Sequence, residues 1–249
     1  MKIKAVIFDL DGVIFDSWPT TIKVIKKIKD EFNETMDEDF IAKSWGMVGY
    51  QWVKILFPNA SPEIIHRRWT EEEAKIKIPL CPAVKEILHW LKNWEFKTGI
   101  ITNRRAGYLL KKVIEDNQLN LKENFDFIQT VRARGPNFGV YNNRKLHPNH
   151  FFSVFAKPDK RIFRSVRRFL KKEGIDKENI LFIGDTIGAD LKLARNLEIE
   201  FLGVLTGPID TRKKWRDWGG LDEKYVLKSV IELPRWLSGR QNKELIGKV

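Results

Sequence analysis

A short apolar run that ends in two acids places the strongest constraint on how this chain folds. Residues 3–8 read IKAVIF, which predicts a strand buried on both faces, as in a parallel sheet. Asp9 and Asp11 follow it, and because side chains alternate along an extended segment, both carboxylates point to the same side, while Gly12 permits a tight exit. Ligands of open α/β sheets bind at this carboxyl edge. The segment therefore predicts an α/β fold with paired carboxylates at its ligand-binding edge.

Other interpretations of the Asp-Leu-Asp-Gly segment are a calcium loop and an ordinary turn. A helix–loop–helix calcium site requires glycine five residues after the first Asp and Glu six residues beyond that, where this chain has Ile14 and Thr20. The calcium loop is therefore excluded, whereas a structural turn stays open for this segment alone. The catalytic interpretation has a chemical basis, because one carboxylate can attack while the other carries the proton.

A second polar segment follows a second apolar run. Residues 96–101 predict a buried strand that ends in Thr102, Asn103 and Arg104. Backbone N–H groups at a strand-to-helix turn favour an anion, so this segment is a candidate phosphate seat. Helix capping by Thr102 or Asn103 is the competing interpretation, and it does not exclude that role.

Two more polar segments complete the pattern. Lys157 stands just ahead of a predicted helix that opens at Pro158, where a lysine of so basic a chain would otherwise be a solvated surface charge. The apolar residues 180–183 predict another buried strand, which leads into Asp185, with Asp190 five residues further on. Acids thus appear again at the end of a strand.

These four motifs, in this order, resemble those of the haloacid dehalogenase superfamily of aspartate-nucleophile phosphatases. The first motif is matched by Asp9 and Asp11, the second by Thr102, the third by Lys157, and the fourth by Asp185 and Asp190. The segments after Phe15 and Cys81 are similar to the phosphoglycolate-phosphatase-like branch, although that branch usually has Pro-Gly where Cys81-Pro82 stand here. The resemblance implies a doubly wound, mostly parallel Rossmann-like α/β core with a small α-helical cap.

The resemblance also implies roles for these residues. Asp9 would attack phosphorus, Asp11 would act as general acid and base, and Thr102, Asn103 and Lys157 would hold the phosphoryl oxygens. An anionic carboxylate is repelled by an anionic phosphate, so a hard divalent cation is expected, most plausibly Mg²⁺. Its site would comprise Asp9, the backbone carbonyl of Asp11, Asp185 and Asp190, the last holding a metal-bound water or organising the loop rather than binding directly.

Residues 16–79 carry several helical patterns and are predicted to form the cap, with residues 1–15 and 80–249 as the catalytic core. The expected cap helices cover residues 21–32, 37–45, 51–57 and 62–76. A glycine loop of the cap meets the substrate in the similar branch, and Trp45 and Gly46 match it, although core packing explains Trp45 equally well. The 249 residues suffice for a core of about 185 and a cap of about 65.

The net charge of +12 is concentrated in one window. Residues 131–172 hold twelve Lys or Arg against one acid, Asp159, which leaves +11. Part of this window, residues 131–155, resembles a basic insertion loop. It could bind a nucleic acid, another polyanion or an acidic partner, or it could be a solvated basic surface.

The sequence thus predicts a Mg²⁺-dependent phosphatase that acts on a small phosphomonoester through a phospho-aspartate. As the resemblance implies, the dehalogenases and phosphonatases of this superfamily lack an aspartate at the position of Asp11, so Asp11 favours ester hydrolysis. Three alternatives stay open: a phosphatase for nucleotides or nucleic-acid ends, a phosphosugar mutase, and a binding protein without turnover.

No apolar run is long enough to span a membrane and no signal-peptide pattern is found, so a cytoplasmic location is expected. His147 and His150 are interpreted as loop residues.

Overall fold

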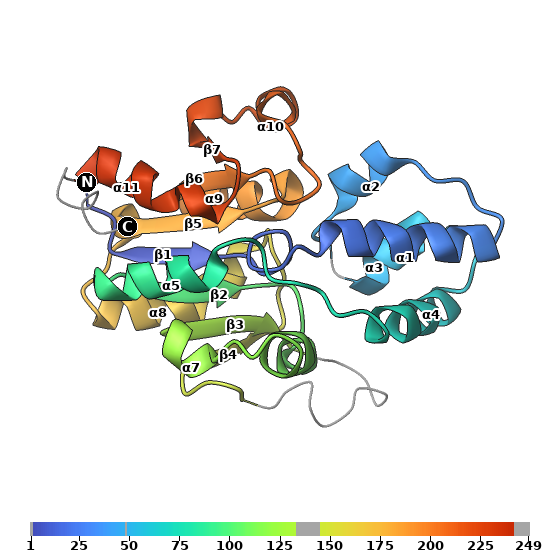
Figure 1. Cartoon of the computed structure of the whole chain (residues 1–249), viewed down its shortest axis with the longest axis horizontal. Coiled ribbons are helices and arrows are strands. Elements are labelled where there is room, and N and C mark those ends of the chain that lie inside the picture. Colours follow the sequence, from blue (N-terminus) through green and yellow to red (C-terminus); the bar gives the residue numbers. More distant parts are fainter. Residues whose placement is uncertain (1, 48, 133–144, 242–249) are drawn as a thin grey trace.

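The computed structural model describes residues 2–47, 49–132 and 145–241, which form a doubly wound α/β core and a helical cap (Figure 1). The core is built on a seven-stranded, all-parallel sheet with strand order β4-β3-β2-β1-β5-β6-β7. The strands are β1 (Ala5–Phe8), β2 (Lys97–Ile101), β3 (Phe127–Val131), β4 (His150–Ser153), β5 (Ile180–Gly184), β6 (Glu200–Val204) and β7 (Val226–Leu227). The predicted fold class is confirmed.

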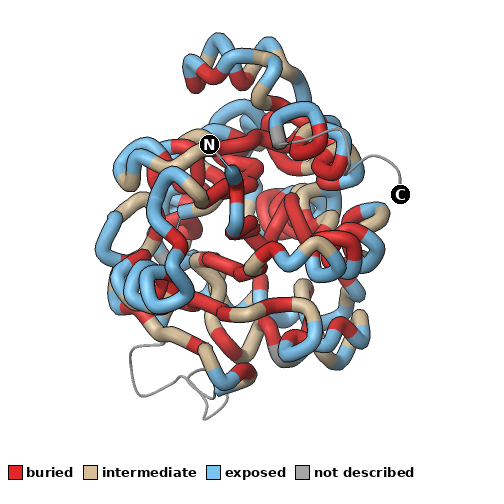
Figure 2. Tube along the Cα trace, turned by 90° about the vertical axis from the view of Figure 1, so that its left-hand side faces the viewer, coloured by how far each residue is buried: buried red, intermediate tan, exposed pale blue. Residues whose placement is uncertain are grey.

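The central strands are buried on both faces because their apolar side chains alternate between two cores. In β1, Val6 and Phe8 pack into one hydrophobic cluster, whereas Ala5 and Ile7 pack into the other. Such a strand cannot expose either face to water, which is why its sequence is continuously apolar. Figure 2 shows these buried segments in the interior, with exposed stretches on the outside.

Helices cover both faces of the sheet. The first cluster includes residues of α5, η1, α7 and α11, and the second includes residues of η3, α8, α9 and α10. The helices of the core are α5 (Val84–Asn93), α6 (Ala106–Tyr108), η1 (Leu109–Glu115), α7 (Leu121–Asn124), η3 (Lys160–Phe163), α8 (Arg164–Lys172), η4 (Lys177–Asn179), η5 (Ile187–Leu191), α9 (Lys192–Leu197), α10 (Arg212–Gly219), η6 (Glu223–Tyr225), η7 (Val230–Glu232) and α11 (Leu233–Gln241).

The cap stands beyond the carboxyl ends of the strands (Figure 1). It consists of α1 (Trp18–Glu31), α2 (Glu38–Ser44), α3 (Gly49–Leu56) and α4 (Pro62–Ala74), close to the helices that the sequence predicts. These helices share a core of their own, in which the rings of Trp18, Trp45, Trp52 and Trp69 follow one another edge to face, with centroids 5.2, 5.2 and 5.4 Å apart. Such aromatic contacts add to the burial of apolar area.

Two adjacent segments connect the cap to the core. The backbone N–H of Asp16 donates to the carbonyl of Pro79 at 3.0 Å, and that of Cys81 donates to Ile14 at 2.8 Å. Phe15 and Leu80 form an antiparallel bridge between these bonds. The chain therefore leaves and re-enters the core at one place, next to the end of β1.

The prediction that residues 131–155 form an insertion loop was wrong in part. Residues 150–153 form the edge strand β4, which pairs with β3. His150 begins this strand and is buried, so its interpretation as a loop residue was also wrong; its ring lies 3.0 Å from Thr130 Oγ1. Residues 133–144, including Arg134 and Arg144, lie outside the described residues.

No helix among residues 2–47, 49–132 and 145–241 has both the length and the apolarity of a membrane span.

Candidate active site

The candidate residues lie where β1, β2 and β5 end. Asp9 follows β1, Thr102 follows β2 and Asp185 follows β5, while Lys157 lies in the segment between β4 and η3. The sheet order reverses at β1, which pairs with β2 on one side and β5 on the other. This is the switch point at which open α/β sheets bind ligands.

Lys157 holds together two of the acids. Its Nζ lies 2.6 Å from Oδ1 of Asp9 and 2.7 Å from Oδ1 of Asp190, and all three side chains are buried. A buried ammonium needs such partners, because an unpaired charge in the interior is costly. The alternative of a solvated surface lysine is therefore wrong.

Asp190 organises the loop after β5. Its Oδ2 accepts hydrogen bonds from the Thr186 hydroxyl at 2.6 Å and from the Thr186 N–H at 3.1 Å, and the Thr186 hydroxyl in turn accepts from the Asp190 N–H. The loop continues into the π-helical turn η5, a rare conformation that often occurs at functional sites. With Oδ1 bound to Lys157, both carboxylate oxygens of Asp190 are engaged.

Asp185 differs, because one of its oxygens is unsatisfied. Its side chain is fully buried, and Oδ1 has no hydrogen-bond partner among the described residues. Two glycines crowd the other side: a Cβ on Gly12 or on Gly207 would stand 2.0 or 2.2 Å from Oδ2 of Asp185. Any other residue at either position would displace this carboxylate.

The acids form a set that fits a hard cation. Oxygens of Asp9, Asp185 and Asp190 lie within 4.8 Å of one another. Carboxylate oxygens are the ligands that Mg²⁺ prefers, and a buried, unpaired carboxylate oxygen is costly unless something binds it. The donor set therefore fits a divalent cation.

The crowding of acids changes their protonation. Burial and the neighbouring carboxyl of Asp190 raise the pKa of Asp9 to about 7, while Lys157 limits the rise. Burial, followed by Asp190 and Asp9, also raises the pKa of Asp185. Burial disfavours the ammonium of Lys157, but Asp190 and Asp9 outweigh that effect and raise its pKa. The lysine is therefore charged at neutral pH.

Asp11 faces a separate set of partners. Arg104 Nε lies 2.8 Å from its Oδ2, and the hydroxyl of Tyr108 donates to its Oδ1 at 3.2 Å. The same guanidinium lies 4.1 Å from the Tyr108 ring centroid and contacts Glu73 of α4, with Nη2 3.3 Å from Oε1. Arg104 thus connects Asp11 to the cap.

The remaining predicted residues connect the cap to the core. Asn103 Nδ2 donates to the carbonyl of Gly46 at 2.7 Å, and its Oδ1 accepts from the N–H of Lys157 at 2.8 Å. Trp45 Nε1 donates to Oδ2 of Asp185 at 3.1 Å. Thr102 is buried, and its hydroxyl accepts from the N–H of Arg104 at 3.0 Å.

The structure therefore brings every predicted site residue to one region, and it adds partners that the sequence interpretation missed. The missed residues are Arg104, Tyr108, Glu73, Thr186 and Gly207. Arg104 directly follows Thr102 and Asn103, so its position after a predicted strand was a usable signal. Glu73 and Tyr108 lie in helices with no local motif, and the sequence held no comparable signal for them.

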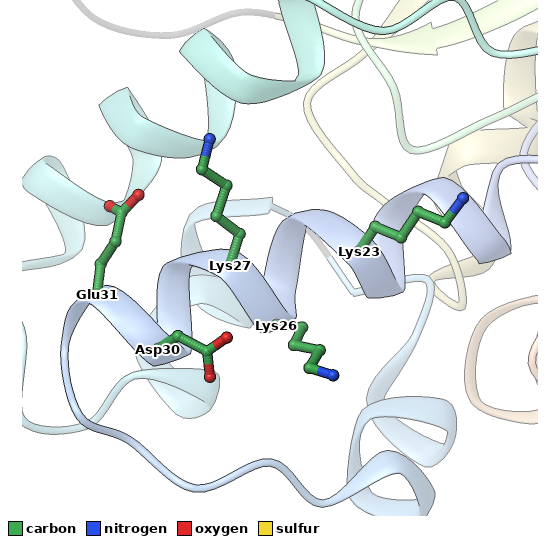
Figure 3. A pocket seen from close by; sticks show the side chains of 5 residues that line it. All are labelled: Lys23, Lys26, Lys27, Asp30 and Glu31. Carbon is green, nitrogen blue, oxygen red and sulfur yellow. The ribbon is translucent and has the colours of Figure 1, made fainter.

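A surface pocket also lies away from the candidate active site. A pocket of about 520 Å³ along α1 is lined by Lys23, Lys26, Lys27, Asp30 and Glu31. Figure 3 shows Lys26 and Lys27 pointing to opposite sides of the helix, and Lys27 pairs with Glu72 of α4 at 2.8 Å. None of the clustered acids lines this pocket, so it is not part of the candidate site.

Comparison with known families agrees with this geometry. The sequence profile of the haloacid dehalogenase-like hydrolases matches residues 6–136, and a second profile of hydrolases of this type matches residues 154–233. The two matches together include all four motifs. The chain belongs to the haloacid dehalogenase-like hydrolase family.

Individual relatives are distant. A phosphorylated carbohydrates phosphatase of Thermotoga maritima is 25% identical over 149 residues, which cover 56% of this chain and 68% of that protein. The structure of a predicted phosphoglycolate phosphatase from Haemophilus somnus superposes with a TM-score of 0.66 at 17% identity, covering 94% of this chain and 98% of that one. A β-phosphoglucomutase from Clostridium difficile gives a TM-score of 0.58 at 17% identity, with coverage of 95% and 98%. These likenesses show the fold.

Proposed function

We propose that this protein hydrolyses a small phosphomonoester through a phospho-aspartate formed on Asp9, with Mg²⁺ as cofactor. The observation that carries the proposal is the buried group of Asp9, Lys157, Asp185 and Asp190 at the switch point of the sheet. The group contains three carboxyl groups and only one cation, Lys157, so it is suited to bind a further cation that would keep the carboxyls ionised.

Asp9 is the proposed nucleophile. Its Oδ1 is fixed by Lys157, which leaves Oδ2 to form the bond to phosphorus as the bond to the leaving oxygen breaks. Asp11, two residues along, is the proposed acid that gives the leaving oxygen its proton. It then takes a proton from the water that cleaves the phospho-aspartate and releases phosphate.

The other residues hold and neutralise the phosphoryl group. Lys157, Thr102 and Asn103 are proposed to contact its oxygens, where fixed donors stabilise the transition state. Asp9, the backbone carbonyl of Asp11 and Asp185 would hold Mg²⁺, and Asp190 would order the loop around it. Bound there, the ion would offset the charge repulsion between the carboxylate and the phosphate.

The cap is proposed to be residues 16–79, with Trp45 and Gly46 on its substrate side. Gly46 and Trp45 contact the core next to Asn103 and Asp185, so a substrate must fit beneath this loop. The name of the Thermotoga maritima relative supports a phosphorylated carbohydrate as one candidate substrate. A phosphosugar mutase would use the same acids, and it differs in passing the phosphoryl group to a second sugar oxygen.

The test is phosphate release from a panel of sugar phosphates, phosphoglycolate, nucleotides and end-phosphorylated oligonucleotides, with Mg²⁺ or EDTA. We expect Mg²⁺-dependent release that falls at least about 10⁴-fold in Asp9→Asn, since loss of a nucleophile removes the covalent path. Asp222→Asn, the same change at an exposed carboxylate, is the matched control and should retain full activity. Isomerised sugar phosphate without free phosphate would identify a mutase instead.

A second candidate function rests on the basic surface of the core. Lys160, Arg164, Arg167, Arg168, Lys171 and Lys172 are all exposed on η3 and α8, while Asp159, the acid of this window, pairs with Arg161. Such a surface could draw in a nucleotide or a nucleic-acid end. If the protein only binds such a partner, Asp9→Asn should keep binding it, and wild type should show no metal-dependent hydrolysis.

A further inference from the structure

Trp45 forms a direct bond between the cap and the cluster of acids. Its indole N–H donates to Oδ2 of Asp185 at 3.1 Å, across 140 positions of sequence. Both side chains are buried, Trp45 at 5% and Asp185 at 0% exposure. When Asp185 is ionised this is a charge-assisted bond, which strongly influences how the carboxylate is oriented.

The two carboxylate oxygens of Asp185 have different surroundings: Oδ2 is hydrogen-bonded to Trp45, and Oδ1 is not hydrogen-bonded to any described residue. Oδ2 accepts the indole N–H, and the backbones of Gly12 and Gly207 approach it so closely that a Cβ on either would stand 2.0 or 2.2 Å from it. Oδ1 is buried and has no hydrogen-bond partner among the described residues, and an oxygen of this carboxylate lies within 4.8 Å of oxygens of Asp9 and Asp190. The free oxygen is therefore the one available to a cation, because the indole N–H occupies the other.

The cap holds the indole rigidly in this position. The Trp45 ring lies edge to face between those of Trp18 and Trp52, with both centroids 5.2 Å away. The next residue, Gly46, has φ +86°, and a Cβ there would stand 3.1 Å from the Cβ of Ala189. The loop thus packs directly on the segment after β5, and the bond to Asp185 exists only while the cap occupies this place.

We propose that Trp45 is a positioning residue for the metal site: it orients Asp185 for a divalent cation and thereby couples cation binding to cap closure. This inference rests on the proposed function, which supplies the cation. A partner that holds a metal ligand in place typically contributes 10- to 100-fold in metal affinity. Because coupling is reciprocal, the cation should stabilise the closed cap as much as the closed cap favours the cation.

The first experiment measures Mn²⁺ binding by the loss of the free-ion electron paramagnetic resonance signal, since carboxylate sites that take Mg²⁺ also take Mn²⁺. Trp45→Phe removes the N–H and keeps an aromatic ring. Trp52→Phe is the matched control, because the Trp52 indole donates to Ser44 within the cap, at 2.8 Å. We expect the Mn²⁺ dissociation constant to rise about tenfold in Trp45→Phe and less than about twofold in Trp52→Phe.

Equal affinity of wild type and Trp45→Phe would overturn the inference and leave the proposed metal intact. Equal weakening by both variants would overturn it too, because the effect would then be general damage to the cap. Failure of wild type itself to bind Mn²⁺ would remove the metal from the proposed function, and this inference with it.

A second measurement needs no variant and stays decisive if Trp45→Phe does not fold. Hydrogen exchange of wild-type backbone amides is followed with and without Mn²⁺. We expect residues 41–47, next to the indole, to exchange more slowly with Mn²⁺, whereas amides in α11, on the far side of the core, should not change. Unchanged exchange over residues 41–47 with bound Mn²⁺ would overturn the coupling.

Discussion

At the residue scale, the proposed chemistry depends on one lysine among several buried acids. Lys157 contacts Asp9 and Asp190 at 2.6 and 2.7 Å, and nothing else in this group carries a positive charge. Removing one member of a buried ion pair leaves an uncompensated charge, which costs more than the pair itself contributes. The lysine is therefore expected to matter to folding as well as to the proposed catalysis.

We predict that Lys157→Met lowers the free energy of unfolding by about 3–5 kcal/mol at pH 8. The loss should shrink at pH 5, because Asp9, whose pKa is raised to about 7, is then protonated and needs the ammonium less. Denaturant unfolding at both pH values without added metal measures this. Lys214→Met, at an ion pair with Asp210 that is partly exposed, is the control and should cost no more than about 1 kcal/mol. A loss independent of pH would contradict the argument.

The raised pKa values also predict how a divalent cation affects stability. Asp9 and Asp185 have higher pKa values in the folded protein than when unfolded, so the folded state binds more protons. The contribution of Asp9 to stability is present below about pH 4 and is lost as the pH rises through about 7, and that of Asp185 is likewise present at low pH and lost as the pH rises. A cation binds the ionised carboxylates and competes with these protons.

We therefore expect Mg²⁺ to raise the melting temperature more at pH 8 than at pH 5. At 100 times the dissociation constant the stabilisation should approach about 2.7 kcal/mol. Thermal unfolding with Mg²⁺ or EDTA at the two pH values measures the difference. Asp185→Asn should lose most of the effect, and an equal shift in that variant would place the cation somewhere else.

At the element scale, helix α4 of the cap contacts the candidate active site through Glu73, which pairs with Arg104. Glu73 contacts Arg104, which in turn holds Asp11, so the position of the cap affects the proposed acid and base. Glu71 lies on the same helix and pairs with Arg68, within the cap. The two acids differ in whether they connect the cap to the core.

We predict that Glu73→Gln lowers kcat/KM about 3- to 10-fold, equivalent to ~0.7–1.4 kcal/mol of transition-state stabilisation. The reason is that Arg104 loses its link to the cap while keeping its contact with Asp11. Steady-state kinetics on the preferred substrate measures it. Glu71→Gln should leave kcat/KM within about twofold, and similar losses in both variants would indicate a general effect on α4.

At the scale of the whole molecule, the charge is distributed unevenly. Most of the exposed basic residues in the described part of residues 131–172 lie on η3 and α8, whereas Lys157 is buried in the candidate site. The apolar side of these helices, including Ile162, Val166 and Leu170, packs on the sheet. The opposite side is therefore free to attract polyanions.

We predict weak binding of a single-stranded oligonucleotide that falls steeply with added salt, because bound cations are released from the phosphates. Fluorescence anisotropy over a salt series measures it. Replacing Arg167 and Arg168 by Gln should reduce the salt slope by roughly one for each phosphate that the protein no longer neutralises. Arg216→Gln, at an ion pair with Glu223, is the control. Absence of binding even at low salt would leave this surface as a solvated one.

The sequence by itself determined the parallel sheet, the helical cap and the acids at the strand ends. Continuous apolar runs predict strands buried on both faces, and Asp9 and Asp185 directly follow such runs, so their proximity is a consequence of local pattern and strand order. Of the strands that the structure describes, β1, β2 and β5 were predicted individually, and β4 was missed because it follows a long basic segment that reads as a loop.

Only the tertiary structure decided how the cap meets the site. The bonds from Trp45 to Asp185 and from Arg104 to Asp11 join residues 140 and 93 positions apart, and the contact of Arg104 with Glu73 joins the core to the cap. Periodicity fixes which face of a helix is apolar, but not where that helix lies relative to a distant loop. The placement follows from how the tryptophan core of the cap and the two connections beside β1 orient the cap over the sheet.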